Sequence, residues 1–162
     1  MRLFIGIKID NKALQKIDNI QKLLYNDGIR GNFTSKNLCH LTLAFLGEIE
    51  EYKVSELIDI ISSIDSSKLK EIKFLNIELM NQILILKVLK TEELDAYHTA
   101  LANELLAHGF NFNYKSFFPH VTLVRESNKD YNKEFIFTSE VTKITLFESK
   151  RINGVLTYTP LN

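Results

Sequence analysis

The chain of 162 residues contains one cysteine, Cys39, and no pair of histidines at metal-binding spacing on a helix. A single thiol cannot form a disulfide within the chain, nor can it supply the several sulfur ligands of a cysteine-based zinc site. No carboxylate neighbours the two histidines that lie in apolar runs, His40 and His120. We therefore expect a protein that uses no metal ion and no other cofactor.

The chain also lacks an excess of charge, because 20 Lys and Arg residues balance 20 Asp and Glu residues. Proteins that coat nucleic acid through bulk electrostatics are strongly basic, so the composition argues against that class. A glycine-rich loop of the kind that cradles phosphates is absent as well. A site for a single phosphate is still compatible with the composition, since it needs only one or two local cations.

Long apolar runs are missing too, and no stretch approaches the roughly 20 residues of a membrane-spanning helix. The apolar run at residues 2–9 is interrupted by Lys8 and carries no small-residue cleavage site, which favours a strand over a signal peptide. Apolar residues nevertheless make up 45% of the chain, enough to build a core. We expect a cytoplasmic monomer with a single domain, residues 1–162, and no membrane contacts.

The sequence does contain one short pattern twice, His-x-Thr-Leu, at residues 40–43 and 120–123. Side chains alternate between the two faces of a strand, so His and Thr share one face while the apolar residues pack on the core. Imidazole is the side chain best suited to proton transfer near neutral pH. A single histidine in an apolar strand is usually structural, but the repeat favours an acid and a base aimed at one reacting group.

The remaining candidates for chemistry have simpler interpretations. His98 and His108 are ten residues apart in an expected helix, about 80° apart around its axis, so they do not form a joint site. We interpret both as structural or solvent-exposed. Cys39 adjoins His40, so the two side chains point to opposite faces of a strand and cannot form a nucleophile pair.

Hydrophobic periodicity predicts helices alternating with strands. The helices are expected at residues 11–26, 51–64 and 91–107, and the strands at residues 2–9, 38–46, 70–79, 82–90, 110–114, 119–125, 140–148 and 154–160. Each half of the chain leads into one histidine strand, which predicts an α+β protein with a two-lobed, duplicated pseudo-twofold fold. Antiparallel sheets would line a central cleft, with the helices outside and one histidine at the cleft from each lobe.

The surroundings of the two histidines identify a family. Residues 37–48 (NLCHLTLAFLGE), residues 117–125 (FFPHVTLVR) and the opening strand at residues 1–7 resemble signature segments of the 2H phosphoesterase superfamily, and residues 146–149 resemble its strand near the C-terminus. Within the superfamily, the chain is similar to the bacterial and archaeal RNA 2′,3′-cyclic phosphodiesterases, also called 2′-5′ RNA ligases. It departs from them at Phe118, where these relatives commonly carry arginine.

The resemblance implies metal-independent opening of a 2′,3′-cyclic phosphate at an RNA or oligonucleotide end, which leaves a 2′-phosphate. It implies that His120 is the base toward water and His40 the acid toward the leaving 3′ oxygen, although the near-symmetry of the motifs permits either order. Thr42 and Thr122 would hold the non-bridging oxygens by hydrogen bonds.

Arg125 is the best candidate cation for the phosphate. Five positions after His120, it faces the opposite side of a regular strand, so a bulge or the strand end must turn it inward. Phe4 and Phe118 could each stack on a base, and core packing is an equal alternative for Phe4. Other cations expected near the site are Lys36, Lys115 and Arg30.

Three alternatives would use the same residues. The substrate could be a 2′-5′-linked oligonucleotide or a small cyclic nucleotide. The protein could be a non-catalytic binder of RNA ends, although binding alone does not require two proton-transfer groups. It could also run the reaction backwards and join a cyclic end to a 5′-hydroxyl, although water at high concentration favours hydrolysis.

Overall fold

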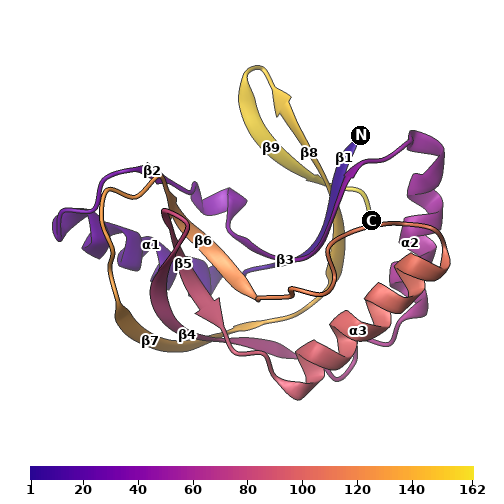
Figure 1. The fold of residues 1–162 in the computed structure, drawn as a ribbon, viewed down its shortest axis with the longest axis horizontal. Coiled ribbons are helices and arrows are strands. Elements are labelled where there is room, and N and C mark those ends of the chain that lie inside the picture. Colours follow the sequence, from indigo (N-terminus) through magenta and orange to yellow (C-terminus); the bar gives the residue numbers. More distant parts are fainter.

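Nine strands and three α-helices make up the structure, a computed structural model that describes all residues from Met1 to Asn162 (Figure 1). The strands span Arg2–Lys8 (β1), Asn32–Phe33 (β2), His40–Glu48 (β3), Glu71–Met80 (β4), Ile83–Val88 (β5), His120–Arg125 (β6), Lys133–Glu140 (β7), Ile144–Ile152 (β8) and Val155–Pro160 (β9). The helices span Asn11–Asn26 (α1), Val54–Ser63 (α2) and Glu92–Ala107 (α3), with short 3-10 turns at Lys36–Leu38 (η1) and Glu51–Lys53 (η2).

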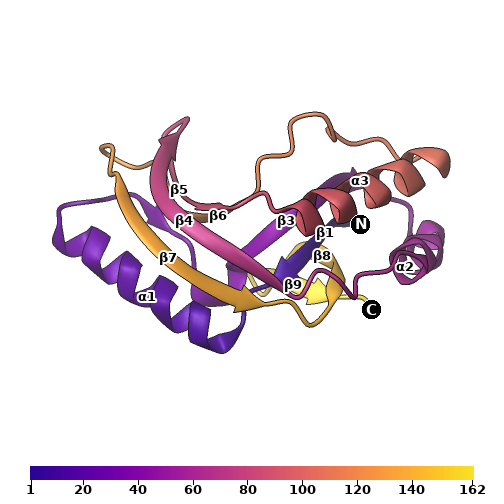
Figure 2. The ribbon, with the colours of Figure 1, turned by 90° about the horizontal axis from the view of Figure 1, so that it is seen from below.

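The strands form two antiparallel sheets, one ordered β3-β1-β8-β9 and the other β2-β6-β5-β4-β7. The five-stranded sheet is strongly curved; α1 packs along β7, while α2 and α3 lie side by side at the other end of the molecule (Figures 1 and 2). One cluster of 35 buried residues joins both sheets and the three helices. The expected α+β fold, with antiparallel sheets and helices outside, is confirmed.

The four-stranded sheet is built around β1, which pairs with β3 on one side and β8 on the other. Its core-facing side chains, Leu3, Ile5 and Ile7, are completely buried. On the other face, a Cβ at Gly6 would lie 2.8 Å from the carbonyl oxygen of Leu41 in β3. Glycine therefore lets the first histidine strand approach β1 closely.

Asp10 fixes the start of α1 against the five-stranded sheet. Its carboxylate accepts hydrogen bonds from the backbone N–H groups of Ala13 in α1 and Glu140 in β7, at 2.8 and 2.7 Å, and its own N–H donates to Ser139 Oγ at 2.8 Å. Burial alone would raise the pKa of Asp10, but these bonds and the nearby Lys12 charge hold it below its ordinary value. The helix cap thus also joins two distant segments.

Two predictions of strands differ from the structure. Residues 110–114 pair with neither sheet, and the segment is anchored instead by the buried side chain of Phe110. The strand expected at residues 140–148 corresponds to β8, which begins only at Ile144. The edge strand β7, at Lys133–Glu140, was not predicted. Burial alternates along β7 at Phe135, Phe137 and Ser139, but the sequence hides this alternation, because Ile136 is exposed and the buried Ser139 is polar.

Candidate active site

The two sheets enclose a cleft with a volume of about 600 Å³, lined by 17 residues. The four-stranded sheet contributes His40 and Thr42 from β3, and the five-stranded sheet contributes His120 and Thr122 from β6. The fold therefore brings both His-x-Thr motifs to one cleft, from two different sheets.

Each of these histidines is fixed by the backbone two residues before it. Nδ1 of His40 lies 2.7 Å from the carbonyl oxygen of Leu38, and Nδ1 of His120 lies 2.6 Å from that of Phe118. A carbonyl oxygen can only accept a hydrogen bond, so Nδ1 carries a proton in both rings. The Nε2 atoms are thus the nitrogens left for proton transfer.

His40 has further contacts in the cleft. The Thr42 hydroxyl lies 2.7 Å from its Nε2 and donates to it when the ring is neutral. The centre of the Phe4 ring is 4.7 Å from that of His40, and the Tyr158 ring meets His40 nearly perpendicularly at 5.2 Å. These neighbours hold the first imidazole in one orientation.

The same enclosure changes the protonation of His40. Burial lowers its pKa below the ordinary value of 6.5, and the positive charges of His120 and Arg125 lower it further, against the opposing effect of the hydrogen bond to Leu38. His40 is therefore mainly neutral at neutral pH in the free protein.

A β-bulge follows the threonine of each motif. The pairing of β3 with β1 skips Leu43, and the pairing of β6 with β5 skips Leu123. An extra residue shifts the alternation of side chains by one, so the residues five positions after the histidines, Phe45 and Arg125, line the cleft. The bulge that Arg125 requires to reach the site is present.

Buried polar side chains from two helices lie against the two bulges. Nε2 of Gln21 in α1 donates to the carbonyl oxygen of Leu123 at 3.0 Å, and His98 in α3 lies beside the carbonyl of Leu43. His98 is only 5% exposed and stacks on Phe117, with 3.8 Å between the ring centres. Of the two interpretations open for His98, the structural one matches this position.

The two aromatic residues considered for base stacking have different surroundings. Phe4 lines the cleft but is only 4% exposed, because the rings of Phe147 and Tyr158 pack on it, with centres 5.0 and 4.9 Å away. Phe118 is 36% exposed and its ring centre lies 6.0 Å from that of His120, outside the lining of the cleft. Phe4 thus forms part of the floor, and Phe118 is the more accessible ring.

The cleft is electropositive although the chain is neutral overall. Its lining includes three arginines, Arg2, Arg125 and Arg151, and no Asp or Glu. None of the three forms an ion pair. The other cations expected near the site, Lys36, Lys115 and Arg30, do not line this cleft.

Arg2 and Arg151 were not among the site residues predicted from the sequence. Strand alternation could have found Arg2, because it shares a face of β1 with Phe4. Strand alternation could not have found Arg151, because the predicted strand ended at residue 148. In the structure β8 continues to Ile152.

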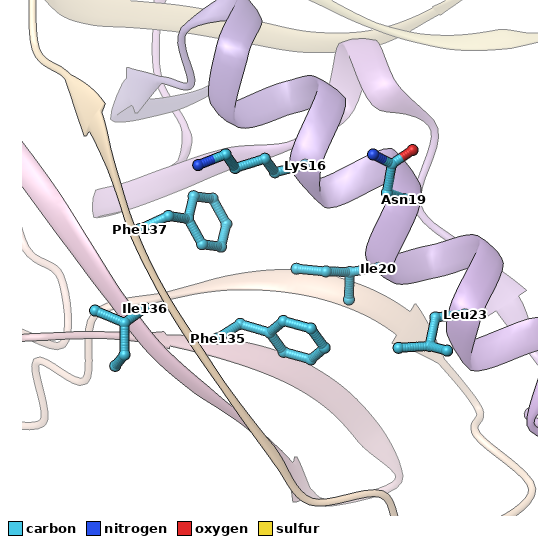
Figure 3. A pocket seen from close by; sticks show the side chains of 7 residues that line it. All are labelled: Lys16, Asn19, Ile20, Leu23, Phe135, Ile136 and Phe137. Carbon is cyan, nitrogen blue, oxygen red and sulfur yellow. The ribbon is translucent and has the colours of Figure 1, made fainter.

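A second hollow, of about 320 Å³, lies between α1 and β7 (Figure 3). Phe135 and Phe137 of β7 point toward Ile20 and Lys16 of α1 across it. Its lining contains no histidine, cysteine or carboxylate, so it offers no groups for acid–base chemistry.

Other chemistries have little support in the structure. Burial raises the pKa of the Cys39 thiol to about 11, so it is protonated at neutral pH and unsuited to nucleophilic attack. No group of three or more His, Cys, Asp or Glu side chains is arranged to hold a metal ion. None of the helices has both the length and the apolar character needed to cross a membrane.

Known proteins resemble this chain in sequence and in fold. A family model described as LigT-like phosphoesterase matches residues 7–83. The chain is 31% identical over 131 residues to the RNA 2′,3′-cyclic phosphodiesterase of Thermotoga maritima, which covers 77% of this chain and 70% of that protein. It is 34% identical over 70 residues to the protein of the same name from Methanocaldococcus jannaschii, covering 43% and 39%.

Solved structures share the fold over nearly the whole chain. LigT of E. coli in its apo form has a TM-score of 0.82 at 23% identity, covering 99% of this chain and 94% of that one. TT0787 of Thermus thermophilus has a TM-score of 0.79 at 18% identity, covering 100% and 96%.

Proposed function

Since the chain belongs to the LigT-like phosphoesterase family of 2H phosphoesterases, we propose that it hydrolyses 2′,3′-cyclic phosphate ends of RNA to 2′-phosphomonoesters. The observation that carries the proposal is the pair of backbone-anchored histidines that line one cleft from two sheets. The names of the relatives from Thermotoga maritima and Methanocaldococcus jannaschii support the same substrate class.

The reaction requires two proton transfers at one phosphorus. Water loses a proton as it attacks, and the 3′ oxygen gains one as its bond to phosphorus breaks. Attack and departure are in line, so the base and the acid must lie on opposite sides of the phosphate. One histidine from each sheet suits this requirement, and each transfer contributes roughly 10²–10⁴-fold to the rate.

We assign the base to His120 and the acid to His40. Burial favours the neutral form of His40 in the free protein, so its second proton depends on the substrate. A phosphate anion beside Nε2 stabilises the imidazolium and so raises the pKa of His40 from its lowered value in the free protein. The ring can then hold the proton that it gives to the leaving oxygen. Proton exchange with solvent then restores both rings.

Three further residues hold the phosphate in this proposal. The hydroxyls of Thr42 and Thr122 donate to the non-bridging oxygens, which gain negative charge as the fifth ligand approaches phosphorus. Arg125 offers a forked pair of N–H donors and a fixed positive charge. Stacking of the terminal base on Phe118 stays a prediction.

The test is incubation of a 2′,3′-cyclic-phosphate oligonucleotide with the protein in excess EDTA, followed by identification of the phosphate position in the product. The cleft offers two imidazoles and no carboxylate, so we expect a 2′-phosphate end and full turnover with the chelator. No conversion, or activity lost to EDTA and recovered with a divalent cation, would contradict the proposal. A 3′-phosphate product would show that the 2′ oxygen leaves instead.

A further inference from the structure

The cleft carries more positive charge than one reacting phosphate needs. Arg125 follows the second histidine motif and is assigned to that phosphate. Arg2 and Arg151 also line the cleft, but they belong to β1 and β8, on the face of the four-stranded sheet that carries His40. Their positive charges are therefore available to bind a second anionic group of the substrate.

These two arginines lie at the end of the cleft away from the histidines. Gly6 of β1 pairs with Thr42, and Arg2 is four residues further along β1, about 13 Å at the usual rise of a strand. Arg151 lies in the same direction on β8, two residues beyond Ser149, which also lines the cleft. One nucleoside, together with the long arginine side chains, can bridge this separation.

Their hydrogen-bonding groups are largely unused. The Arg2 guanidinium lies over the Phe45 ring, 4.8 Å from its centre, and makes no ion pair. Arg151 donates once, from Nη1 to the carbonyl oxygen of Gly154 at 3.1 Å. The carboxylate opposite Arg2, that of Glu48, is paired with the N-terminal ammonium at 3.4 Å. Stacking thus orients Arg2 while its N–H donors stay free.

We propose that Arg2, Arg151 and Ser149 form a second anion subsite, which binds the internucleotide phosphodiester on the 5′ side of the reacting terminal nucleotide. The inference rests on the proposed function, because that function places the cyclic phosphate at the histidines. Two forked guanidinium groups and a hydroxyl match the oxygens of a phosphate, and no carboxylate of the cleft opposes them. The substrate class is then an oligonucleotide of at least two nucleotides, and a cyclic mononucleotide is a poor substrate.

The test compares three substrates: adenosine 2′,3′-cyclic phosphate, its 5′-phosphorylated form, and the dinucleotide ApA with a 2′,3′-cyclic end. We expect kcat/KM for the dinucleotide to exceed that for the mononucleotide by about tenfold, the worth of one charge-assisted hydrogen bond. Arg151→Ala and Arg2→Ala should each remove most of this gain, and each should lower kcat/KM far more for the dinucleotide than for the mononucleotide. The 5′-phosphorylated mononucleotide carries a phosphate at the same 5′ oxygen, so it should share this gain. A gain for ApA but none for the 5′-phosphorylated mononucleotide would show that the second nucleoside, rather than the phosphate, is bound, against the proposal.

Lys150→Ala is the matched control. Lys150 lies between Ser149 and Arg151 on β8, does not line the cleft, and is 3.9 Å from Glu148. Its loss removes the same charge from the same hairpin, so it should leave the dinucleotide gain intact. Equal effects of Lys150→Ala and Arg151→Ala, or equal losses for mononucleotide and dinucleotide in Arg151→Ala, would overturn the subsite.

Binding of the products separates this inference from the proposed function. Calorimetric affinities for adenosine 2′-phosphate and for ApA with a 2′-phosphate end report the subsite without turnover. If no cyclic phosphate is hydrolysed but the dinucleotide product still binds about tenfold tighter through Arg151, the proposed function fails and the subsite stands. If the mononucleotide is hydrolysed but neither kcat/KM nor affinity improves with the second nucleotide, the proposed function stands and the subsite fails.

Discussion

At the scale of single residues, the two histidines share an anchor and differ in their surroundings. Both donate from Nδ1 to a backbone carbonyl, yet only His40 is held through Nε2 by a threonine and lies against Phe4. Burial lowers the pKa of His40 as a result. Two side chains of one type can therefore start the reaction in different protonation states.

The first prediction concerns the histidines themselves. His40→Ala and His120→Ala should each lower kcat by at least about a hundredfold, because each removes one proton-transfer group. Both side chains face the cleft, so circular dichroism and the melting temperature should stay close to wild type. His108→Ala is the control: this histidine caps the end of α3 in solvent and should leave kcat unchanged. Near-wild-type kcat in either cleft variant would exclude that residue as acid or base.

The second prediction concerns pH. One imidazole must be neutral and the other protonated, so kcat/KM should follow a bell-shaped profile whose limbs belong to the pair. The productive form carries a single proton on the pair, and it forms as the pH rises past the lower of the two pKa values. Burial lowers the pKa of His40 below 6.5 in the free protein, so the acidic limb of kcat/KM should lie below pH 6.5. In the profile of kcat this limb should lie at higher pH, because a bound phosphate anion stabilises the imidazolium.

The substitution Arg125→Gln should shift the acidic limb of kcat/KM in a defined direction. The Arg125 charge contributes to lowering the pKa of His40, so its removal should move the acidic limb of kcat/KM toward higher pH. Measurement of kcat/KM across the acidic range for both proteins decides the matter. An unmoved limb, or one moved to lower pH, would mean that His40 does not govern it.

At the scale of elements, the two histidine strands share a bulge after the threonine, and a buried polar side chain of a helix lies at each bulge. Gln21 of α1 donates to the carbonyl oxygens of Leu123 and Thr34, at 3.0 and 2.9 Å, while His98 of α3 lies beside the carbonyl of Leu43. The bulge at Leu123 sets the direction of Arg125. A glutamine that does not line the cleft thereby helps to position a cation in it.

Gln21→Leu tests this support. The substitution leaves the carbonyl of Thr34 without its donor and weakens the bulge, so the free energy of unfolding should fall by about 1–3 kcal/mol. We expect KM for a cyclic phosphate to rise more than kcat falls, because Arg125 contacts the phosphate and transfers no proton. Gln15→Leu, on the exposed face of the same helix, should change neither quantity. Loss of stability without any rise in KM would limit Gln21 to a structural role.

The sequence predicted elements well wherever a local signal was strong. The helix at Asn11–Asn26 matches its predicted range, and the turns at residues 80–82 and 153–154 are present, with positive φ at Asn81 and Asn153. The edge strand β7 was missed because it buries few side chains and depends on pairing with β4. An edge strand of this kind forms because it pairs with a strand that is distant in the sequence. Hydrophobic periodicity is a local property and does not predict such a pairing.

The cleft was predictable only in part. The two motifs locate His40 and His120 in the sequence, because the repeated pattern is local. Arg151 lines the cleft through the register of β8 against β1 and β9, and its contribution follows from pairings between distant segments. Cations brought to a site by sheet register have no signature of their own in the sequence.

At the scale of the whole molecule, neutrality hides an uneven distribution of charge. The chain has a formal net charge of zero, yet the cleft is lined by three arginines and no acidic residue. Such a cleft attracts an anion locally, while a net charge of zero provides no general attraction for a long polyanion. Recognition should therefore be confined to the end of the RNA.

This distribution predicts how activity depends on RNA length. Beyond the dinucleotide, kcat/KM should level off, so that ApA and an oligonucleotide of about twenty residues with the same cyclic end are hydrolysed with similar efficiency. The salt dependence should be shallow and similar for both, because only the few phosphates in the cleft release counterions. A steep gain with length that moderate salt removes would reveal a basic surface outside the cleft.

The backbone anchors of the two histidines have a consequence for mutational tolerance. Many sites orient a histidine through another side chain, which a single substitution can delete. Here the acceptors are the carbonyl oxygens of Leu38 and Phe118, and every amino acid has a carbonyl. The genetic code therefore offers no substitution that removes the acceptor itself. The residues at positions 38 and 118 can therefore be substituted while both histidines keep a proton on Nδ1.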